Sequence, residues 1–594
     1  MLICMRPASI RRRFGPMNPE HLKRQLSKAI GQLSGVPETD IYAWIEVPPD
    51  PAMGDLALPC FRLSKHMRQA PQKIAVFLHE QLTERFDQIV RMEAVNGYFN
   101  VFYDRVWFAD SVIREALEAD GRPGYNPTAG AGKTALIEFS SPNIAKEFHI
   151  GHAFTTLLGQ AIANLYEYRG YSVVRMNHLG DYGTQFGNLI VAWKRWGDEA
   201  ALAADPIAEL QRVYVRFHRE SETDPELEAE GRSAFLKLER GDPEAVQLWQ
   251  TFRQQSLDFF NLTYDRLGIH FDNTNGESFY SDKIPGLMNW LRSRDLLTMS
   301  EGAVVVDLEE YKLPPCLLIK TDGTTIYASR DLAAILWRDE TYNFDLNVYV
   351  VGLPQSHHFK QVFSVMKKAG FEKADRLIHV GFGTVLFGDQ TFSTRQGNTI
   401  PLNRLLDESV AKTRAIIEKN NPGMSAEQIG ETAEKIGISA VVYTFLQNGR
   451  EKDIHFSWDQ VLDFEGDSAP YLLYTLARCH SIRAKADTGH AGETASFDKQ
   501  YAQYLTDDEA VAVLKLVDSF GLAIDAAVHA FEPSIMIRHT MTLARAFNKF
   551  YQNHSFLFAD SEAESKARLF LLDAVIATLS AGIRLAGMQV VERM

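Results

Sequence analysis

The chain has 594 residues, 45% of them hydrophobic and 23% charged, and a formal net charge of −14. This composition is typical of a globular protein with several domains, and no run of eighteen apolar residues predicts a membrane-spanning helix. The negative charge argues against a uniformly basic nucleic-acid-binding protein, although it leaves room for a local basic surface.

The number and spacing of the cysteines indicate the redox state of the compartment in which the protein is found. The four cysteines are Cys4, Cys60, Cys316 and Cys479. They lie far apart in the sequence and form no CxxC pair, so we expect free thiols in a reducing compartment and no zinc site built from them.

Residues 1–17 form a basic tail without an acidic residue. Its arginines are Arg6, Arg11, Arg12 and Arg13. Such a stretch fits a mitochondrial targeting segment, an upstream start codon with Met17 as the true start, or a disordered tail. The tail has no long apolar core, which argues against a secretory signal. We favour a tail or a misassigned start, and a cytoplasmic location, over mitochondrial targeting.

Residues 18–120 are predicted to form a small domain with both helices and strands. Apolar positions recur at helical spacing in His21–Leu33 and Ile74–Phe86, whereas Asn96–Tyr103 alternates and is rich in aromatic residues. Within that strand, Tyr98 and Asn100 share one face. Aromatic stacking and amide hydrogen bonds are a common way for proteins to bind splayed RNA bases, but a core tyrosine beside a turn-forming asparagine has the same pattern.

A Gly- and Pro-rich linker at 121–132 precedes a predicted nucleotide-binding domain at 133–400. Its strands are expected at Ala135–Phe139, Leu346–Val351 and Arg376–Phe382. Because helical patterns lie between them, we predict an α/β domain with a doubly wound parallel sheet and ligands at the carboxyl ends of its strands. Residues 195–261 are charged and helical, and we expect them to form an insertion that packs on the sheet.

Residues 401–594 are predicted to form a nearly all-helical bundle. Apolar stripes mark helices at Ala411–Lys419, Glu431–Asn448, Tyr471–Ala486, Glu509–His529, Ser534–Asn553 and Ser565–Leu585. From residue 440 onward there are 14 basic and 20 acidic residues, so any RNA-binding face must be a small patch. Tyr471, Tyr474 and Arg478 share one helix face, which fits either such a patch or a buried stripe.

The most informative segment is Ser141–His152, which reads S-P-N-I-A-K-E-F-H-I-G-H. It follows a strand pattern and precedes a helical one. It is therefore predicted to end at a helix N-terminus, where free N–H groups and the helix dipole favour phosphate. His149 and His152 are suited to donate hydrogen bonds to phosphate oxygens, and Gly151 leaves the backbone open to a ligand. A metal-binding pair and two ordinary surface histidines stay open as alternatives.

This segment resembles the HIGH signature of class I aminoacyl-tRNA synthetases, and in its details that of the arginyl-tRNA synthetases. The block from Ile137 to His152 and the block Asn177–Gly187 (N-H-L-G-D-Y-G-T-Q-F-G) both follow the family pattern. The likeness extends from about Trp44 to Met594. It implies a Rossmann-like catalytic domain between a small α+β domain that contacts the tRNA elbow and an all-α anticodon-binding domain.

The resemblance also implies a two-step reaction. The carboxylate of L-arginine attacks the α-phosphate of ATP, which travels with Mg²⁺, and the arginyl group of the adenylate then passes to the terminal ribose of tRNA(Arg). Both steps depend on positioning and charge stabilisation and need no protein nucleophile. We expect no protein-bound zinc, no membrane partner and a monomer.

Site residues are assigned through the resemblance. The expected arginine-binding residues are Glu138, Ser140, Asn143, Tyr327, Asp331 and Gln355. The expected ATP-binding residues are Lys146, His149, Gly151, His152, Ser393, Thr394 and Arg395. The expected tRNA-binding residues are Tyr98, Asn100, Tyr471, Tyr474, Arg478 and Met594. Among these, Glu138 and Asp331 are the two acids for the guanidinium, because its fixed fork of donors suits carboxylates.

The second class I signature, KMSKS, is altered in this chain. The matching loop reads F-S-T-R-Q-G-N over residues 392–398 and contains no lysine. Many arginyl enzymes share this loss, and the lysine that precedes HIGH, here Lys146, is thought to compensate. Lys146, His149, His152 and Arg395 are therefore the expected catalytic residues, although the guanidinium of Arg395 is not a simple replacement for an ammonium. Activation of the amino acid is expected to need bound tRNA.

Three other interpretations stay open. A related nucleotidyltransferase could use the same turn without RNA, but the helical C-terminal region argues against it. A non-catalytic RNA-binding paralogue is disfavoured by the intact residues Lys146, His149 and His152. A synthetase for another amino acid is disfavoured by the acid pair Glu138 and Asp331, which favours a cationic side chain.

Overall fold

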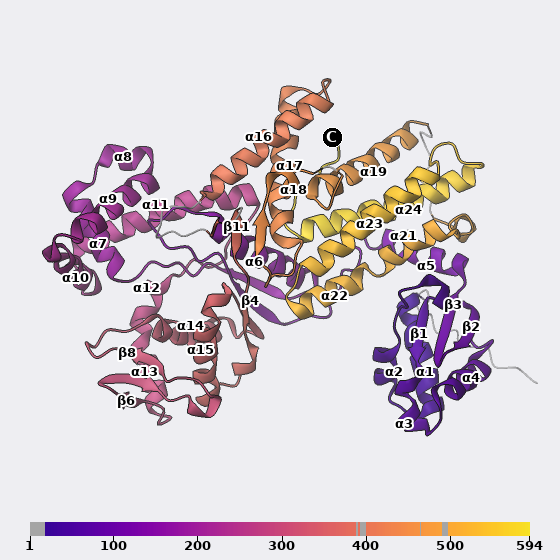
Figure 1. Cartoon of the computed structure of the whole chain (residues 1–594), viewed down its shortest axis with the longest axis horizontal. Helices are drawn as coiled ribbons and strands as arrows, with labels where there is room; N and C mark the ends of the chain where they lie inside the picture. The colour runs from indigo at the N-terminus through magenta and orange to yellow at the C-terminus, as the bar shows by residue number, and fades with distance from the viewer. Residues whose placement is uncertain (1–17, 388–389, 392–399, 464, 490–496, 594) are drawn as a thin grey trace, which may run out of the picture. The chain divides into compact units, whose positions relative to one another are not determined.

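The computed structural model describes residues 18–387, 390–391, 400–463, 465–489 and 497–593 (Figure 1). By its internal contacts the chain divides into two compact units. The first contains the residues up to 123 together with 479–521 and 542–579, and the second contains 124–478, 522–541 and the residues from 580 onward.

In the first unit, the N-terminal domain is built on a three-stranded antiparallel sheet. Its order is β1 (Leu56–Pro59), β3 (Tyr98–Tyr103), β2 (Ile89–Val95), so β3 is the central strand. The helices are α1 (Pro19–Ser34), α2 (Glu38–Trp44), α3 (Ser64–Met67), α4 (Pro71–Leu82) and α5 (Arg105–Glu118). The predicted helices and strand are confirmed, except that α4 ends at Leu82. Helix α5 was not predicted, although Asp104 caps it by accepting the Trp107 N–H at 2.7 Å.

The second unit contains the predicted parallel sheet. Its order is β10 (Leu377–Val380), β9 (Leu346–Val350), β4 (Thr134–Glu138), β5 (Ser172–Met176). All four strands are parallel, so the segments that follow them emerge at one edge of the sheet. Helix α6 (Ile150–Tyr168) connects β4 to β5. Leu136 and Tyr349 of the sheet share a buried cluster with Leu332 of α14 (Tyr327–Tyr342) and Phe359 of α15 (Ser356–Lys368).

Two small sheets were not predicted. One is antiparallel and contains β6 (Thr298–Ser300), β7 (Ala303–Val306) and β8 (Cys316–Ile319). The other pairs β11 (Val385–Phe387) with β12 (Gln390–Thr391) and β13 (Ile454–Phe456). Two short helices, α12 (Glu277–Tyr280) and α13 (Ile284–Arg292), precede β6. Segments of two to four residues are too short for hydrophobic alternation to mark them.

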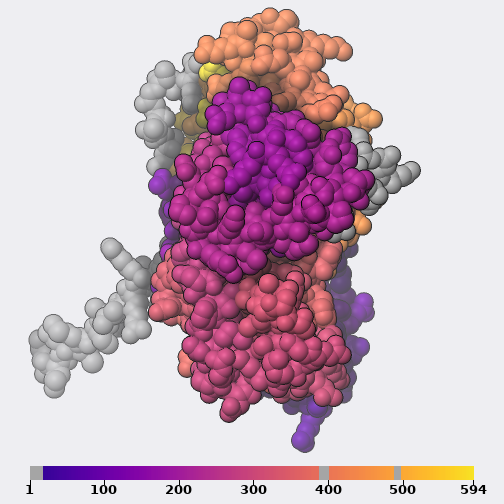
Figure 2. Space-filling view, turned by 90° about the vertical axis from the view of Figure 1, so that its left-hand side faces the viewer, coloured from indigo at the N-terminus to yellow at the C-terminus, as the bar shows by residue number. Residues whose placement is uncertain are grey.

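The charged stretch after β5 is helical, as predicted, but it does not pack on the sheet as expected: its buried cluster includes Ile144, Ala145 and Leu179 of the loops that follow β4 and β5 and no residue of the sheet strands. It consists of α7 (Thr184–Trp196), α8 (Glu199–Ala204), α9 (Pro206–Ser221), α10 (Pro225–Glu239) and α11 (Pro243–Leu267). An aspartate caps each of the last four helices, and a proline follows that aspartate in α9, α10 and α11, which is a strong signal for a helix start. Figure 2 shows these helices as one continuous lobe above the residues around 280–380.

The predicted C-terminal helices are present with one difference. The helices are α16 (Leu402–Asn420), α17 (Ala426–Leu446), α18 (Trp458–Val461), α19 (Ala469–Gly489), α20 (Lys499–Ala502), α21 (Asp508–Asp518), α22 (Phe520–Ala530), α23 (Ser534–Asn553) and α24 (Glu562–Leu585). The single helix predicted over 509–529 is two helices, because α21 ends at Asp518 and Ser519 caps it. Across the residues described, none of the helices combines the length and apolar character that crossing a membrane requires.

Candidate functional site

Strand β4 ends at Glu138, and the loop that follows it holds three non-glycine residues in left-handed backbone conformation. Their φ angles are 69° for Ser140, 48° for Ser141 and 57° for Ala145. Each such residue costs about 1–2 kcal/mol, so neighbouring groups must hold the loop in place. The backbone N–H of each is bound by a side chain: Thr155 Oγ1 (3.2 Å from Ser140 N), Asn177 Oδ1 (3.1 Å from Ser141 N) and Ser256 Oγ (2.9 Å from Ala145 N).

The two histidines lie at the N-terminus of α6, where His149 is the capping residue. The Gly151 N–H donates to Nδ1 of His149 at 3.1 Å, and the His149 N–H donates to Nδ1 of His152 at 3.3 Å. Since both Nδ1 atoms accept, the proton of each neutral ring is on Nε2. The histidines can therefore present Nε2–H donors at a helix terminus that already favours anions.

Burial keeps both rings neutral at pH 7. Burial, with the charge of Lys146, lowers the pKa of His149 to about 4. Burial, with the neighbouring His149 and Lys146, lowers the pKa of His152 to about 3. Gly151 is required here for a reason the sequence did not show: a Cβ at this position would lie 2.9 Å from Cε1 of the His149 ring.

Lys146 lies on the same loop and is half-buried. Burial lowers the pKa of its ammonium group. Its Nζ is 5.9 Å from the ring centroid of Tyr214 on α9, so the insertion forms part of the surroundings of this lysine. The loop thus carries one cation and two neutral donors.

A second group of side chains surrounds Asp331 in the second turn of α14. Its Oδ2 is 2.6 Å from Nε2 of His358, and its Oδ1 is 3.9 Å from Nε2 of His178. Burial raises the pKa of Asp331, but the hydrogen bond and charge of His358, with His178 and Arg338, outweigh burial and leave the pKa lowered. His178 follows β5 and His358 follows β9, so this ionised carboxylate lies at the sheet edge on which β4 opens into its loop.

Tyr327 is beside that carboxylate. Its side chain is 54% exposed, and its ring centroid is 4.8 Å from that of His358 in an edge-on contact. An accessible ring near a carboxylate is suited to a cationic ligand. His178 and His358 were missed by the sequence analysis, although His178 lies in the quoted block 177–187 and His358 is three residues after Gln355.

The structure gives Glu138 an internal partner that the sequence analysis did not include. Its Oε2 is 2.5 Å from a terminal nitrogen of Arg338, and the side chains are 7% and 1% exposed. The Arg338 guanidinium also lies over the rings of Tyr349 and Tyr280, at 5.4 and 5.9 Å. The negative charge of Glu138 is therefore already balanced inside the protein, and its expected role as a ligand of the substrate guanidinium stays a prediction.

Glu277, at the start of α12, is the other acid near Asp331. Burial raises its pKa, Arg330 and His178 act in the opposite direction, and the negative charge of Asp331 adds to the increase. Its Oε2 accepts from Nε of Arg330 at 2.9 Å, and a quarter of its side chain is exposed. No sequence motif singled out Glu277, because it precedes Asp331 by more than fifty residues.

The remaining expected arginine-binding residues differ in accessibility. Asn143 and Gln355 are exposed. The carboxamide of Asn143 lies against Gly180, where a Cβ would be 2.1 Å from its Oδ1. Ser140 is 3% exposed, and its hydroxyl is bound to Tyr264 Oη at 2.8 Å and to Thr156 Oγ1 at 2.9 Å. Its hydroxyl is thus occupied within the protein.

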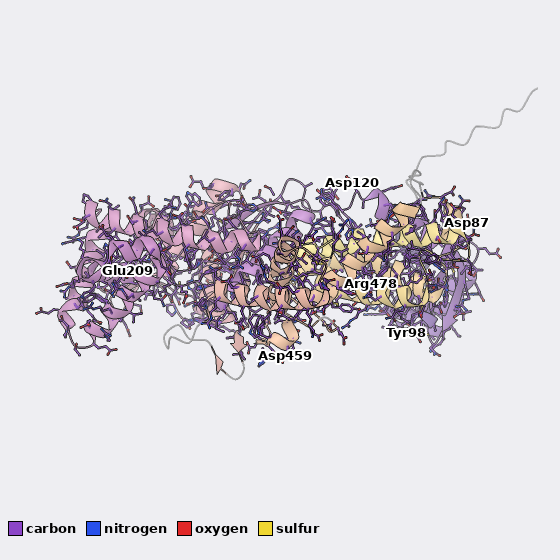
Figure 3. All side chains as sticks on the ribbon, turned by 90° about the horizontal axis from the view of Figure 1, so that it is seen from above. Asp87, Tyr98, Asp120, Glu209, Asp459 and Arg478 are labelled. Carbon is purple, nitrogen blue, oxygen red and sulfur yellow. The ribbon has the colours of Figure 1, made fainter. Side chains whose placement is uncertain are left out.

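The expected RNA-contacting residues were also located. Asn100 is 1% exposed, and its carboxamide has no hydrogen-bond partner among the described residues. Because β3 is the central strand, this burial is an obstacle to contact with a base, whereas Tyr98 is half-buried. On α19, Tyr474 is 44% exposed, and the Arg478 guanidinium lies 4.8 Å from the centroid of its ring. Figure 3 labels Tyr98 and Arg478 on their elements.

Four expected site residues lie outside the described residues. They are Ser393, Thr394, Arg395 and Met594. Their roles stay predictions.

Comparison with known proteins gives matches along nearly the whole chain. Residues 113–458 match the family described as tRNA synthetases class I (R), catalytic domain. Residues 20–103 match the arginyl tRNA synthetase N terminal domain, and residues 472–594 match the DALR anticodon binding domain.

Individual relatives agree with these matches. The arginine–tRNA ligase of Clostridium perfringens is 45% identical over 555 residues, which cover 93% of this chain and 96% of the relative. The arginyl-tRNA synthetase structure from Thermus thermophilus is 25% identical with a TM-score of 0.80, over 96% of this chain and 100% of that one. The Plasmodium falciparum structure, at 22% identity, TM-score 0.78 and coverage of 96% and 99%, supports the fold. The chain therefore belongs to the class I arginyl-tRNA synthetases.

Proposed function

We propose that this protein is a ligase that activates L-arginine with ATP, forming arginyl-adenylate and pyrophosphate, and then transfers the arginyl group to the 3′ end of tRNA(Arg). The observation that carries the proposal is the ionised carboxylate of Asp331, beside the exposed Tyr327 and at the sheet edge where the phosphate-binding turn begins. Binding of a guanidinium requires such a carboxylate. Formation of an adenylate requires the amino-acid site and the phosphate-binding turn to be adjacent, so that the substrate carboxylate can reach the α-phosphate.

The acid pair that holds the substrate guanidinium is Asp331 and Glu277. Each carries a charge that the other disfavours, so a cation between them relieves the repulsion that contributes to the raised pKa of Glu277. Glu138 instead forms a buried ion pair with Arg338. A neutral amino acid would bring no positive charge to the two carboxylates, which is the physical source of specificity.

The phosphates of ATP, which brings Mg²⁺ with it as part of the substrate, are bound at the N-terminus of α6. The Nε2–H groups of His149 and His152 donate to phosphate oxygens, and Lys146 stabilises the charge that develops at the α-phosphate. These groups bind and orient the reactants; the attacking nucleophile is the substrate carboxylate. Asn143 and Gln355, which are exposed, hold the polar end of arginine.

The tRNA contacts proposed here are Tyr98 in the N-terminal domain and Tyr474, Arg478 and Tyr471 on α19. The exposed ring of Tyr474 and the guanidinium beside it can stack on an unpaired base. A cytoplasmic location and a monomeric state are further proposals that rest on the sequence.

The deciding experiment is aminoacylation with each of the twenty amino acids, with and without tRNA. Arginine alone is expected to be charged, and the Lys146→Ala variant is expected to form adenylate at least about tenfold more slowly, equivalent to about 1.4 kcal/mol of barrier. Charging with lysine or glutamate in place of arginine would overturn the assignment of the substrate.

A further inference from the structure

Helix α11 presents one face to the loop that carries Lys146. Ser256, Phe260 and Tyr264 are spaced four residues apart, so they lie on the same side of the helix, and each is at most 2% exposed. In Figure 1, α11 extends from the group α8–α10 toward α6. The inserted helices, to which the sequence analysis assigned no chemistry, thus reach the reaction centre.

All three residues contact the strained loop. Ser256 Oγ accepts the Ala145 N–H at 2.9 Å, directly before Lys146. The ring centroids of Phe260 and Tyr264 are each 5.5 Å from that of Phe148. The hydroxyl of Tyr264 is 2.8 Å from Ser140 Oγ and accepts from Asn177 Nδ2 at 3.1 Å.

Helix α11 also makes contacts with residues outside that loop. Toward its N-terminus, Arg253 Nε is 3.0 Å from Asp181 Oδ2, and the Trp249 Nε1–H donates to the Asp181 carbonyl at 2.8 Å. Toward its C-terminus, Thr263 Oγ1 donates to Asn403 at 3.0 Å, and Arg266 pairs with Asp407 and Glu434. A helix fixed at both ends can hold a flexible loop in one conformation.

We propose that α11 positions Lys146 for adenylate formation, with Ser256 as the positioning residue that acts through Ala145. This rests on the proposed role of Lys146. Ala145 is left-handed at φ 57° and is not glycine, so its conformation persists only while the surroundings hold it. Without the Ser256 hydroxyl, the Ala145 N–H loses its acceptor and the loop relaxes, which moves the adjacent lysine away from the transition state.

The test is pyrophosphate exchange at saturating tRNA(Arg), comparing Ser256→Ala, Lys146→Ala and the double variant. Ser256→Ala is expected to lower kcat about ten- to a hundredfold while the KM for arginine stays within about twofold. In the Lys146→Ala background the same substitution is expected to have no further effect, because its target is gone. Ser256→Cys keeps the side-chain volume but offers a weaker acceptor, and it is expected to show the same pattern should Ser256→Ala fail to fold.

Thr263→Val is the matched control. Thr263 is also a fully buried hydroxyl on α11, but its partner is Asn403 of α16, so this variant is expected to keep kcat within about twofold. Equal losses in the Thr263 and Ser256 variants, or a full additional loss in the double variant, would overturn the inference and leave Lys146 catalytic. An unchanged rate in Lys146→Ala would instead overturn the proposed role of the lysine.

Discussion

The buried pair of Glu138 and Arg338 allows a sharp comparison with Glu277. In Glu138→Gln the Arg338 guanidinium, which is 1% exposed, loses its counter-charge while it stays buried. Removing one partner from such a pair costs about 3–5 kcal/mol of stability. Little discount for solvent applies, since Glu138 is only 7% exposed. We therefore expect Glu138→Gln to act mainly on folding.

Glu277→Gln is expected to act mainly on substrate binding. A quarter of the Glu277 side chain is exposed, whereas its partner Arg330 is only 9% exposed. Losing this ion pair is therefore expected to cost stability, but less than losing the fully buried pair of Glu138 and Arg338. Loss of a charge-assisted hydrogen bond to the substrate guanidinium costs about 1.5–3 kcal/mol, which corresponds to roughly a ten- to hundredfold increase in the KM for arginine.

The two effects are separated by urea unfolding and by steady-state kinetics on the same preparations. Glu138→Gln should lower the unfolding midpoint strongly, with the KM of the remaining folded enzyme changed much less. Glu277→Gln should lower the unfolding midpoint much less and raise the KM for arginine much more. A Glu138→Gln variant of normal stability and greatly raised KM would refute the reasoning and restore Glu138 as the guanidinium ligand.

Four more outcomes are expected. Since His149 and His152 are neutral in the fold, kcat should show no step from them between pH 6 and 8, as a pH–rate profile would detect. The pKa values of both histidines are lower in the folded protein than in the unfolded chain, so the unfolded chain binds more protons between about pH 6.5 and 4. The free energy of unfolding measured in urea should therefore decrease as the pH is lowered through this window, by up to about 1.4 kcal/mol per histidine per pH unit. Gly151→Ala should displace the His149 ring and lower kcat at least about tenfold in pyrophosphate exchange, with arginine KM unchanged. Tyr474→Ala should raise the KM for tRNA in aminoacylation assays and leave that for ATP unchanged; equal changes in both would exclude it from the RNA interface.

The sequence predicted the parts of the fold that follow from local rules. The parallel sheet, the helical insertion and the C-terminal helices have strong hydrophobic periods, and the insertion helices also have Asp-Pro starts. The breaks and short strands were missed, since a helix end at Asp518 or a three-residue strand such as β6 is decided by packing partners distant in sequence.

In the candidate site, too, contacts between residues close in sequence could be predicted and contacts between distant residues could not. Lys146, His149 and His152 lie within one turn and one helix start, so their sequence order alone indicates that they meet. The partners of Asp331 come from two other segments, and only the topology of the sheet brings His178 and His358 to the same carboxylate. A sequence motif predicts which residues are close in space when they are separated by few residues. It gives no such prediction when they are separated by many.

The assignment of Glu138 shows the limit of arguing from a single residue. An acid at the end of a parallel strand is where a ligand is expected, yet its chemistry depends on whether another charge has already been placed against it. Arg338 is 200 residues from Glu138 and about two helical turns beyond Asp331, so the strand pattern did not indicate this partner. The net charge around a buried carboxylate decides whether it binds a substrate cation or a neighbouring side chain. The partners of Asp331 are histidines, so its negative charge remains available to a ligand. The negative charge of Glu138 is balanced by Arg338.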